Sequence, residues 1–264
     1  MTTSKERPVA LVTGAGQGVG QGIARALAAA GVRVVVSDQE TRRAEETATA
    51  LRSEGAEAHP LTLDVTSTPD WANAVRFLDD ALGRLDILVN NAGISPRGSI
   101  ESTSEALWER TLAVNLSGAF QGVKATWSRL CRHRGTVVNV GSTRSTRPMR
   151  GMVAYGTSKA ALLGLTRQIA VEGLKHGVTC NMIAPGWVDT PGERIIQANL
   201  GRPEFPEGIL NLTTIEEIGA GVVFLVSPPG RRVNGVILYM DAGLHLADDA
   251  GMVYLPETDT RRYT

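Results

Sequence analysis

The chain has 264 residues, 42% of them apolar and 5% aromatic, and its 27 lysine and arginine residues equal its 27 aspartate and glutamate residues in number. A chain of this length is ordinary for one α/β unit and buries a large core without disulfide or metal staples. The zero net charge leaves no footprint for nucleic acid, and no apolar run approaches the length of a membrane span.

Cysteine usage and the polar start of the chain indicate a protein of the cytoplasm. Cys131 and Cys180 form no metal-ligand pattern, so we expect reduced structural thiols and no metal site. Residues 1–7 are polar and lead directly into a strand, which is not typical of a signal peptide. We therefore expect a cytoplasmic protein that binds neither nucleic acid nor membranes.

Apolar, β-branched runs alternate with helix-length amphipathic runs along most of the chain. Strands are expected at residues 9–13, 32–37, 61–65, 86–90, 136–140, 178–183 and 236–240. Helices are expected at residues 17–30, 41–54, 69–82, 104–132, 154–176 and 214–226. Repeated βα units of this length predict an α/β fold of the Rossmann type, with a doubly wound, seven-stranded parallel sheet and helices on both faces. We expect one domain over residues 1–264.

Two stretches depart from this alternation. Residues 189–212 carry Pro191, Pro203 and Pro206 and have no clear period. They follow the carboxyl end of a strand, where ligands bind in open α/β sheets, so we interpret them as a substrate lid, with a plain surface insertion as the alternative. Residues 246–264 form a tail that the sheet does not need.

A glycine-rich turn, Thr-Gly-Ala-Gly-Gln-Gly-Val-Gly at residues 13–20, follows the first expected strand and opens a helix. Missing Cβ atoms let backbone N–H groups approach a diphosphate, whose charge the helix dipole favours. Such a turn is a weak signal alone, but its place in the first βα unit favours dinucleotide binding. The expected contacts are Gly14, Gln17, Gly18, Val19 and Gly20.

Asp38 ends the second expected strand, where a carboxylate would accept hydrogen bonds from the adenosine ribose hydroxyls. It would also repel a 2′-phosphate, which favours NAD as the cofactor over NADP. Arg42 and Arg43 follow and either hold a phosphate or form a solvated helix face.

Polar and small residues close the next two strands. Asp64 precedes Val65, and its carboxylate either reaches the adenine amino group or serves as a turn residue. Asn91, Ala92 and Gly93 follow the fourth strand, where asparagine and glycine suit a backbone that lies close to a ligand. All are expected along the edge where a dinucleotide would lie.

Tyr155 and Lys159 are four residues apart at the start of a helix and therefore share one helical face. A nearby ammonium favours tyrosinate and would lower the pKa of Tyr155 towards the working pH. This spacing is common by chance, and a core tyrosine with a surface lysine is the alternative. Ser142, thirteen residues before Tyr155, ends the fifth strand and can place a hydroxyl beside the same pocket.

Taken in order, these motifs resemble the short-chain dehydrogenase/reductase family, in its smaller single-domain branch, from Pro8 to about Gly243. The resemblance rests on TGAGQGVG, Asp38, Asp64-Val65, NNAG, Asn115, Ser142, YGTSK and Pro185-Gly186. Each motif is modest, whereas their order and spacing together are highly specific. The resemblance implies an NAD-dependent alcohol dehydrogenase or ketone reductase.

The family resemblance also implies residue roles. Tyr155 would exchange a proton with the substrate oxygen, and Ser142 would hydrogen-bond that oxygen. Lys159 would lower the Tyr155 pKa and hold the nicotinamide ribose. Asn115 would hold a water that links Lys159 to solvent. Tyr155 and Lys159 are thus expected at the cofactor too, and the nicotinamide would contact Pro185, Gly186, Val188 and Thr190.

The substrate pocket is expected to combine apolar residues with basic points. Its expected lining is Ile94, Pro96, Ser142, Arg144, Met149, Trp187 and Ile195, with Ile196. Arg144, Arg147 and Arg150 recur every three residues and either meet an anionic or polyhydroxylated substrate or form a solvated loop.

We expect a sugar, polyol or cyclic secondary alcohol that is oxidised, because Asp38 favours NAD and cells keep NAD oxidised. One rival is an NADPH-dependent 3-oxoacyl-thioester reductase on the same scaffold. Another is a non-catalytic NAD-binding module, which the presence of both Tyr155 and Lys159 disfavours.

The family resemblance further implies a homo-oligomer, a dimer or tetramer, that pairs the helices at residues 104–132 and 154–176. Leu107, Trp108, Leu112 and Phe120 serve either the core or such an interface. In the tail, Tyr254 and residues 261–263 either reach a neighbouring pocket or form a frayed terminus.

Overall fold

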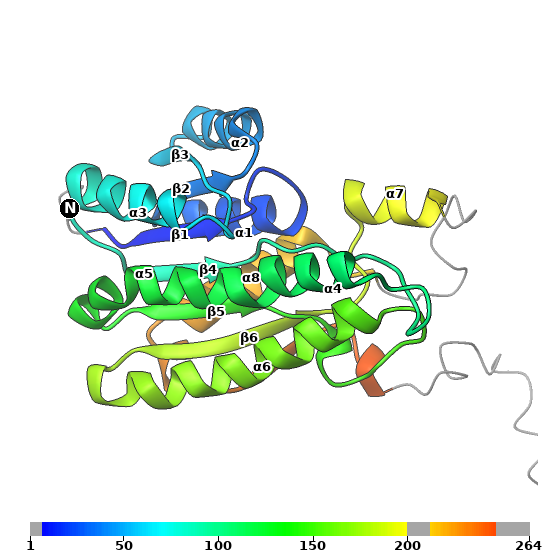
Figure 1. Ribbon diagram of the computed structural model, residues 1–264. Helices are drawn as coiled ribbons and strands as arrows, with labels where there is room; N and C mark the ends of the chain where they lie inside the picture. Colours follow the sequence, from blue (N-terminus) through cyan, green and yellow to red (C-terminus); the bar gives the residue numbers. More distant parts are fainter. Residues whose placement is uncertain (1–6, 200–211, 247–264) are drawn as a thin grey trace, which may run out of the picture.

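The strands of the computed structural model, which describes residues 7–199 and 212–246, form one parallel sheet in the order β3-β2-β1-β4-β5-β6-β7. The strands are β1 (Val9–Thr13), β2 (Arg33–Asp38), β3 (Ala58–Thr62), β4 (Ile87–Asn90), β5 (Thr136–Val140), β6 (Thr179–Pro185) and β7 (Ile237–Met240). The chain winds outward from β1 in one direction and then, from β4, in the other (Figure 1). The predicted Rossmann-type, doubly wound, seven-stranded sheet is confirmed.

Helices cover both faces of this sheet (Figure 1). They are α1 (Gly18–Ala29), α2 (Thr41–Ser53), α3 (Thr68–Phe77), α4 (Glu105–Leu112), α5 (Gly118–His133), α6 (Val153–Gly173), α7 (Pro191–Asn199) and α8 (Ile215–Val226). Apolar residues of α1, α2 and α8 pack on one face, and those of α3, α5 and α6 pack on the other.

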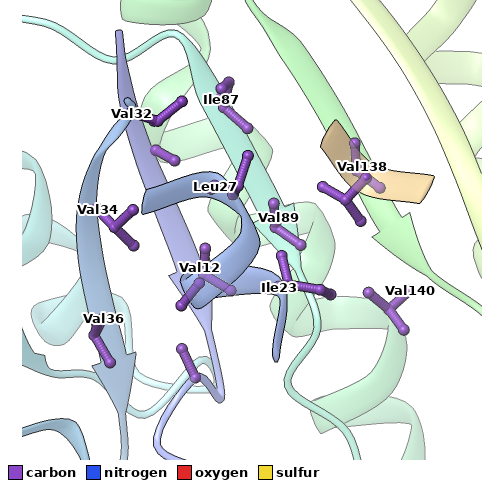
Figure 2. Close-up of a cluster of buried hydrophobic side chains, with 14 of the residues drawn as sticks. Val12, Ile23, Leu27, Val32, Val34, Val36, Ile87, Val89, Val138 and Val140 are labelled. Atoms are coloured by element: carbon purple, nitrogen blue, oxygen red, sulfur yellow. The ribbon is translucent and has the colours of Figure 1, made fainter. Parts of the chain in front are cut away.

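The strands are almost continuously apolar because both of their faces are buried. On the first face, Val12, Val36 and Val89 from neighbouring strands meet Ile23 and Leu27 of α1 (Figure 2). On the second face, alternate residues of the same strands pack against α3, α5 and α6. Burial of these side chains is the main force that holds the helices to the sheet.

The third strand lies three residues earlier than predicted, at Ala58–Thr62 instead of residues 61–65. Its parallel register pairs Val34 with Ala58 and Asp38 with Thr62, so the strand ends before Asp64. Leu63 and Val65 are buried against the core of the second face, which gave this loop its strand-like apolar pattern.

The long helix expected at residues 104–132 is helical but not uniform. A π-helical turn, Ala113–Ser117, joins α4 to α5 and carries Asn115. Such single π turns occur often at functional sites.

Of the expected lid, Pro191–Asn199 is the helix α7, which lies beside the carboxyl ends of the strands (Figure 1), whereas residues 200–211 lie outside the described residues. The tail after Leu246, including Tyr254 and residues 261–263, also lies outside them. Cys131 and Cys180 are free thiols, and burial raises the pKa of each.

Candidate active site

The turn after β1 brings backbone close to backbone. Gly14 has a φ of +60°, a conformation that L side chains rarely adopt. A Cβ atom on Gly20 would overlap the carbonyl oxygen of Gly14 and the side-chain amide of Asn91. Glycine at both positions therefore allows the amino end of α1 to open directly onto a cavity.

That cavity has a volume of about 290 Å³ and lies at the carboxyl edge of the sheet. Twelve of the cofactor residues expected from the sequence line it: Gly14, Gln17, Gly18, Val19, Gly20, Asp38, Asp64, Val65, Asn91, Ala92, Gly93 and Thr190. We call it the first cavity.

Asp38 is only 6% exposed and is held by backbone donors on two sides. Its carboxylate accepts hydrogen bonds from the N–H of Gly16 at 3.2 Å and from the N–H of Glu40 at 3.0 Å. These bonds point a fixed negative charge at the first cavity.

The two arginines after Asp38 differ in position. Arg42 pairs with Glu46 along α2 and is exposed, as a solvated helix face would be. Arg43 pairs with Glu40 at 3.0 Å and also lines the first cavity. Both signs of charge therefore lie at the end of the cavity near Asp38.

Asp64 fits both of its expected roles. One of its oxygens accepts hydrogen bonds from the backbone N–H of Thr66 at 2.9 Å and from the hydroxyl of Thr66 at 2.7 Å, which is a turn interaction. Asp64 nevertheless lines the first cavity together with Val65.

Thr13 ties the loops after β1 and β4 together, a role that the sequence analysis did not assign. Its hydroxyl accepts hydrogen bonds from the N–H groups of Asn91 at 3.0 Å and Ala92 at 3.1 Å. The side-chain amide of Asn91 donates to the carbonyl oxygens of Thr13 and Gly14, both at 2.9 Å. The sequence feature that could have indicated this role is the position of Thr13 as the first residue of the glycine-rich motif.

A second cavity of about 370 Å³ continues along the same edge of the sheet. It shares Val19, Asn91, Gly93, Ile94, Thr190 and Gly192 with the first cavity. It adds Ser142, Tyr155, Lys159, Pro185, Gly186 and Val188. The two cavities form an elongated groove with a glycine cradle in one half and the expected catalytic side chains in the other, which fits a nicotinamide dinucleotide.

Tyr155 stands where this groove meets a third, smaller cavity of about 80 Å³. Ser142 lines both of these cavities as well. Burial raises the pKa of Tyr155, and the Ser142 side chain opposes that shift. Desolvation thus outweighs the favourable interactions in the structure, and a lowering of the Tyr155 pKa by Lys159 stays a prediction.

Lys159 is buried beside Tyr155, with its Nζ 5.8 Å from the centre of the tyrosine ring. The Nζ donates a hydrogen bond to the carbonyl oxygen of Val140 at 2.8 Å. Burial lowers the pKa of Lys159 to about 8. The surface-lysine alternative is therefore wrong, and the same desolvation favours the neutral form of both side chains.

Asn115 clamps the loop that follows β4. Its side-chain oxygen accepts a hydrogen bond from the N–H of Ile94 at 2.8 Å, and its amide donates to the carbonyl oxygen of Ile94 at 2.9 Å. The amide also donates to the hydroxyl of Ser158 at 2.9 Å, which in turn donates to the carbonyl oxygen of Tyr155 at 2.7 Å. Asn115 thereby fixes the cofactor loop relative to α6, and its role in holding a water stays a prediction.

The third cavity is the candidate substrate pocket, and it contains four of the residues expected there: Ser142, Arg144, Met149 and Trp187. Ile94 lines the first and second cavities instead. Pro96 and Ile195 line none of the three cavities, and their contact with the substrate stays a prediction.

Residues near these two do line the substrate cavity. Ser95 and Arg97, on either side of Pro96, are among its lining residues. α7 turns Glu193 towards the cavity, so Ile195 lies on another face of the helix and is 62% exposed. The side chain of Ile196 lies outside what the structure describes.

The three arginines that recur before Tyr155 have separate positions. Arg144 lines the substrate cavity. Arg147 does not, and its guanidinium donates to the carbonyl oxygens of Leu244 at 3.2 Å and His245 at 3.1 Å. Arg150 is exposed outside the cavity. The charged residues that complete the pocket are Arg97 and Glu193, which no sequence signal had marked.

Two features are absent from the described residues, 7–199 and 212–246. No helix in these ranges is long and apolar enough to cross a membrane. No group of three or more histidine, cysteine, aspartate or glutamate residues in these ranges is placed to hold a metal ion.

Comparison with known proteins agrees with this geometry. A family model described as enoyl-(acyl carrier protein) reductase matches residues 14–245. The 2-(S)-hydroxypropyl-CoM dehydrogenase 3 of Xanthobacter autotrophicus is 35% identical over 254 residues, covering 92% of this chain and 99% of that protein. The galactitol 2-dehydrogenase of Rhizobium johnstonii is 36% identical over 244 residues, covering 89% of this chain and 93% of that protein.

A solved structure is also close. An actinorhodin polyketide ketoreductase with NADPH superimposes with a TM-score of 0.86 at 31% identity, covering 93% of this chain and 99% of that one. The chain belongs to the short-chain dehydrogenase/reductase family of oxidoreductases, which use a nicotinamide coenzyme.

Proposed function

We propose that the protein is an NAD-dependent dehydrogenase that oxidises a secondary alcohol, with Tyr155 as the general base and, in the reverse direction, the general acid. The observation that carries this proposal is the position of the Tyr155 hydroxyl. Tyr155 and Ser142 both line the nicotinamide half of the groove as well as the substrate cavity.

In the proposed reaction a bound nicotinamide coenzyme supplies the hydride acceptor. Ser142 orients the substrate oxygen by a hydrogen bond and stabilises the charge that develops on it. Tyr155 takes the hydroxyl proton during oxidation. Lys159 would hold the nicotinamide ribose, and its side chain, when protonated, would favour the tyrosinate.

NAD is proposed as the coenzyme because Asp38 directs a fixed carboxylate at the first cavity. A 2′-phosphate near this carboxylate would meet a like charge in a partly desolvated site. As the sequence suggests, we also propose that the chain forms a single domain and that the protein is cytoplasmic.

A homo-oligomer, a dimer or a tetramer, is proposed from the apolar surface of two helices. Phe120 on α5 is 50% exposed and Val171 on α6 is 62% exposed, while Leu107, Trp108 and Leu112 are half-buried. Large exposed apolar side chains are a feature of protein interfaces. Size-exclusion chromatography with light scattering tests this proposal.

A sugar, polyol or cyclic alcohol is the proposed substrate class. The relatives named for 2-(S)-hydroxypropyl-CoM and for galactitol support a secondary alcohol as the reacting group. The second candidate is an NADPH-dependent 3-oxoacyl-thioester reductase. Arg43 at the first cavity favours it, as does the structural likeness to a ketoreductase with NADPH.

The test is a screen of polyols, sugars and cyclic secondary alcohols with NAD and with NADP, followed by the absorbance of the reduced coenzyme. A parallel arm measures reduction of acetoacetyl thioesters by NADH and by NADPH. Oxidation of an alcohol with NAD supports the proposal, and thioester reduction with NADPH alone selects the second candidate. Coenzyme binding without turnover in any arm would indicate a non-catalytic module.

A further inference from the structure

The substrate cavity has a positively charged wall that the proposed reaction does not require. Arg97 and Arg144 both line the cavity, and both charges lower the pKa of Tyr155, which places them near the reacting hydroxyl. Glu193 of α7 lines the same cavity and raises that pKa. Two positive groups therefore face one negative group around a small volume.

Arg97 is held rigidly relative to Tyr155. The next residue, Gly98, forms a parallel bridge with Met152, which immediately precedes α6. The N–H of Gly98 donates to the carbonyl oxygen of Gly151 at 2.9 Å, and the N–H of Val153 donates to the carbonyl oxygen of Gly98 at 3.2 Å. The backbone that carries the Arg97 guanidinium is thus fixed to the turn that begins the catalytic helix.

The other side of Gly98 is closed as well. A Cβ atom there would lie 2.5 Å from the hydroxyl oxygen of Thr103. This hydroxyl donates to the carbonyl oxygen of Ser99 at 2.7 Å, which braces the loop between β4 and α4. These contacts therefore hold the backbone of the loop that carries Arg97 in one position.

The guanidinium of Arg97 has unused hydrogen-bonding capacity. Its Nε is buried and donates to no atom of residues 7–199 and 212–246. A buried donor without a partner costs free energy, and a carboxylate is its best partner because the guanidinium fork matches two oxygens at once. Arg97 also lines the substrate cavity, so an anionic group bound there would lie next to an arginine whose hydrogen-bonding capacity is not fully used.

We propose that the substrate of this enzyme carries a carboxylate in addition to its reacting hydroxyl, and that Arg97 binds this carboxylate while Glu193 faces the uncharged part of the molecule. The inference rests on the proposed alcohol oxidation, whose substrate class it narrows to hydroxy acids. Arg97 is then a specificity-determining residue, and Arg144 adds a second positive charge to the same wall.

The experiment compares two pairs of probes, each made up of a hydroxy acid and an uncharged analogue that lacks the carboxylate. One pair is 3-hydroxybutyrate and its methyl ester, and the other is D-gluconate and D-sorbitol. For each probe, kcat/KM is measured with NAD, and equilibrium binding to the enzyme loaded with NADH is measured by coenzyme fluorescence. The variants are Arg97→Gln, Arg97→Lys and, as a matched loss of one exposed arginine outside the cavity, Arg150→Gln.

We expect the carboxylate member of at least one pair to be preferred. Arg97→Gln should weaken binding and kcat/KM for that carboxylate by about 10- to 100-fold, the usual effect of losing a hydrogen bond to a charged group. The same variant should change the neutral member by less than about threefold, because that probe makes no such bond. Arg97→Lys should recover part of the loss because it keeps the charge without the fork, and Arg150→Gln should behave as the parent.

Equal binding of the acids and the neutral probes by the parent enzyme would overturn the proposal, as would an Arg97→Gln variant that lowers all probes equally. If Arg97→Gln does not fold, Arg97→Lys and the salt dependence of carboxylate binding decide the question, because a charge contact weakens with salt. Arg97-dependent binding of a carboxylate without oxidation would refute the proposed function and leave the anion site standing. Oxidation of neutral alcohols by an enzyme that ignores acids would refute the anion site alone.

Discussion

The coenzyme half and the substrate half of the groove differ in which parts of the protein form their walls. Around the first cavity, Thr13 and Asn91 bond to each other's backbone, and Asp38 is held by two N–H groups. Around the substrate cavity, side chains from loops and from α7 form the wall, and they include the charged groups of Arg97 and Glu193. The coenzyme half is therefore fixed by the backbone, whereas the substrate half is tuned by individual side chains.

This difference has a physical reason. A dinucleotide presents a diphosphate that backbone N–H groups and a helix terminus recognise without any particular side chain. A substrate is distinguished by its own charges and hydroxyl groups, which only side chains of matching chemistry select. Substitutions in the two halves should accordingly fail in different ways.

The largest effect is expected at the junction of the two halves. Tyr155→Phe removes the hydroxyl that exchanges the proton and should lower kcat by about 10²- to 10⁴-fold. Coenzyme affinity, measured by NADH fluorescence, should stay close to that of the parent because the coenzyme half is intact. Tyr239→Phe is the matched control, since the Tyr239 hydroxyl bonds Thr146 and lines none of the three cavities. Substantial activity in Tyr155→Phe would refute the proposed mechanism.

A backbone-built site should be sensitive to one methyl group. Gly20→Ala places a Cβ atom on the carbonyl oxygen of Gly14, and the resulting overpacking should lower the free energy of unfolding by about 1–3 kcal/mol. Coenzyme binding should weaken in parallel because the turn must move. Gly164→Ala, at an exposed α6 position with no atom near the added Cβ, should not destabilise the fold. Denaturant unfolding and NADH titration measure both, and an unchanged Gly20→Ala would contradict the tight approach.

Coenzyme choice tests the electrostatics of the first cavity. Asp38→Asn removes the fixed negative charge while it keeps an acceptor for one backbone N–H group. The ratio of kcat/KM for NADP to that for NAD should rise about tenfold or more, because a like-charge contact is lost and Arg43 remains. Asp64→Asn, which removes a charge elsewhere in the same cavity, should alter the ratio less. A ratio that does not move in Asp38→Asn would mean that Asp38 does not select the coenzyme.

The smallest effect concerns pH. The negative charge of Glu193 raises the pKa of Tyr155, so Glu193→Gln should lower it. Alcohol oxidation needs the deprotonated tyrosine, and its rate should therefore rise at a lower pH in this variant than in the parent. Arg97→Gln should move the profile in the opposite direction, since the Arg97 charge lowers the same pKa. Glu172→Gln, near the far end of α6, is the control. If all variants have the same pH profile, Glu193 does not influence the pKa of the catalytic tyrosine.

Local patterns were sufficient for most of the coenzyme half. The glycine-rich turn, Asp38 and the residues after β4 each lie within a few residues of a strand end, and parallel strands bring all their carboxyl ends to one edge. The prediction of the third strand was wrong because the buried loop residues Leu63 and Val65 have the apolar pattern of a strand. Burial alone does not distinguish a strand from a loop that packs on the core.

By itself, the sequence determined the alternation of strands and helices, the order of the motifs and hence the family, because each of these is written in short-range spacing. Only the tertiary structure decided which basic residues reach the substrate: Arg97 and Arg144 line the cavity, while Arg147 is bound to the carbonyl oxygens of Leu244 and His245. It also decided the direction of the Tyr155 pKa shift, which burial raises although a lysine lies four positions along the helix. Desolvation and the side to which a loop residue projects depend on segments far apart in the chain, and no local pattern contains them.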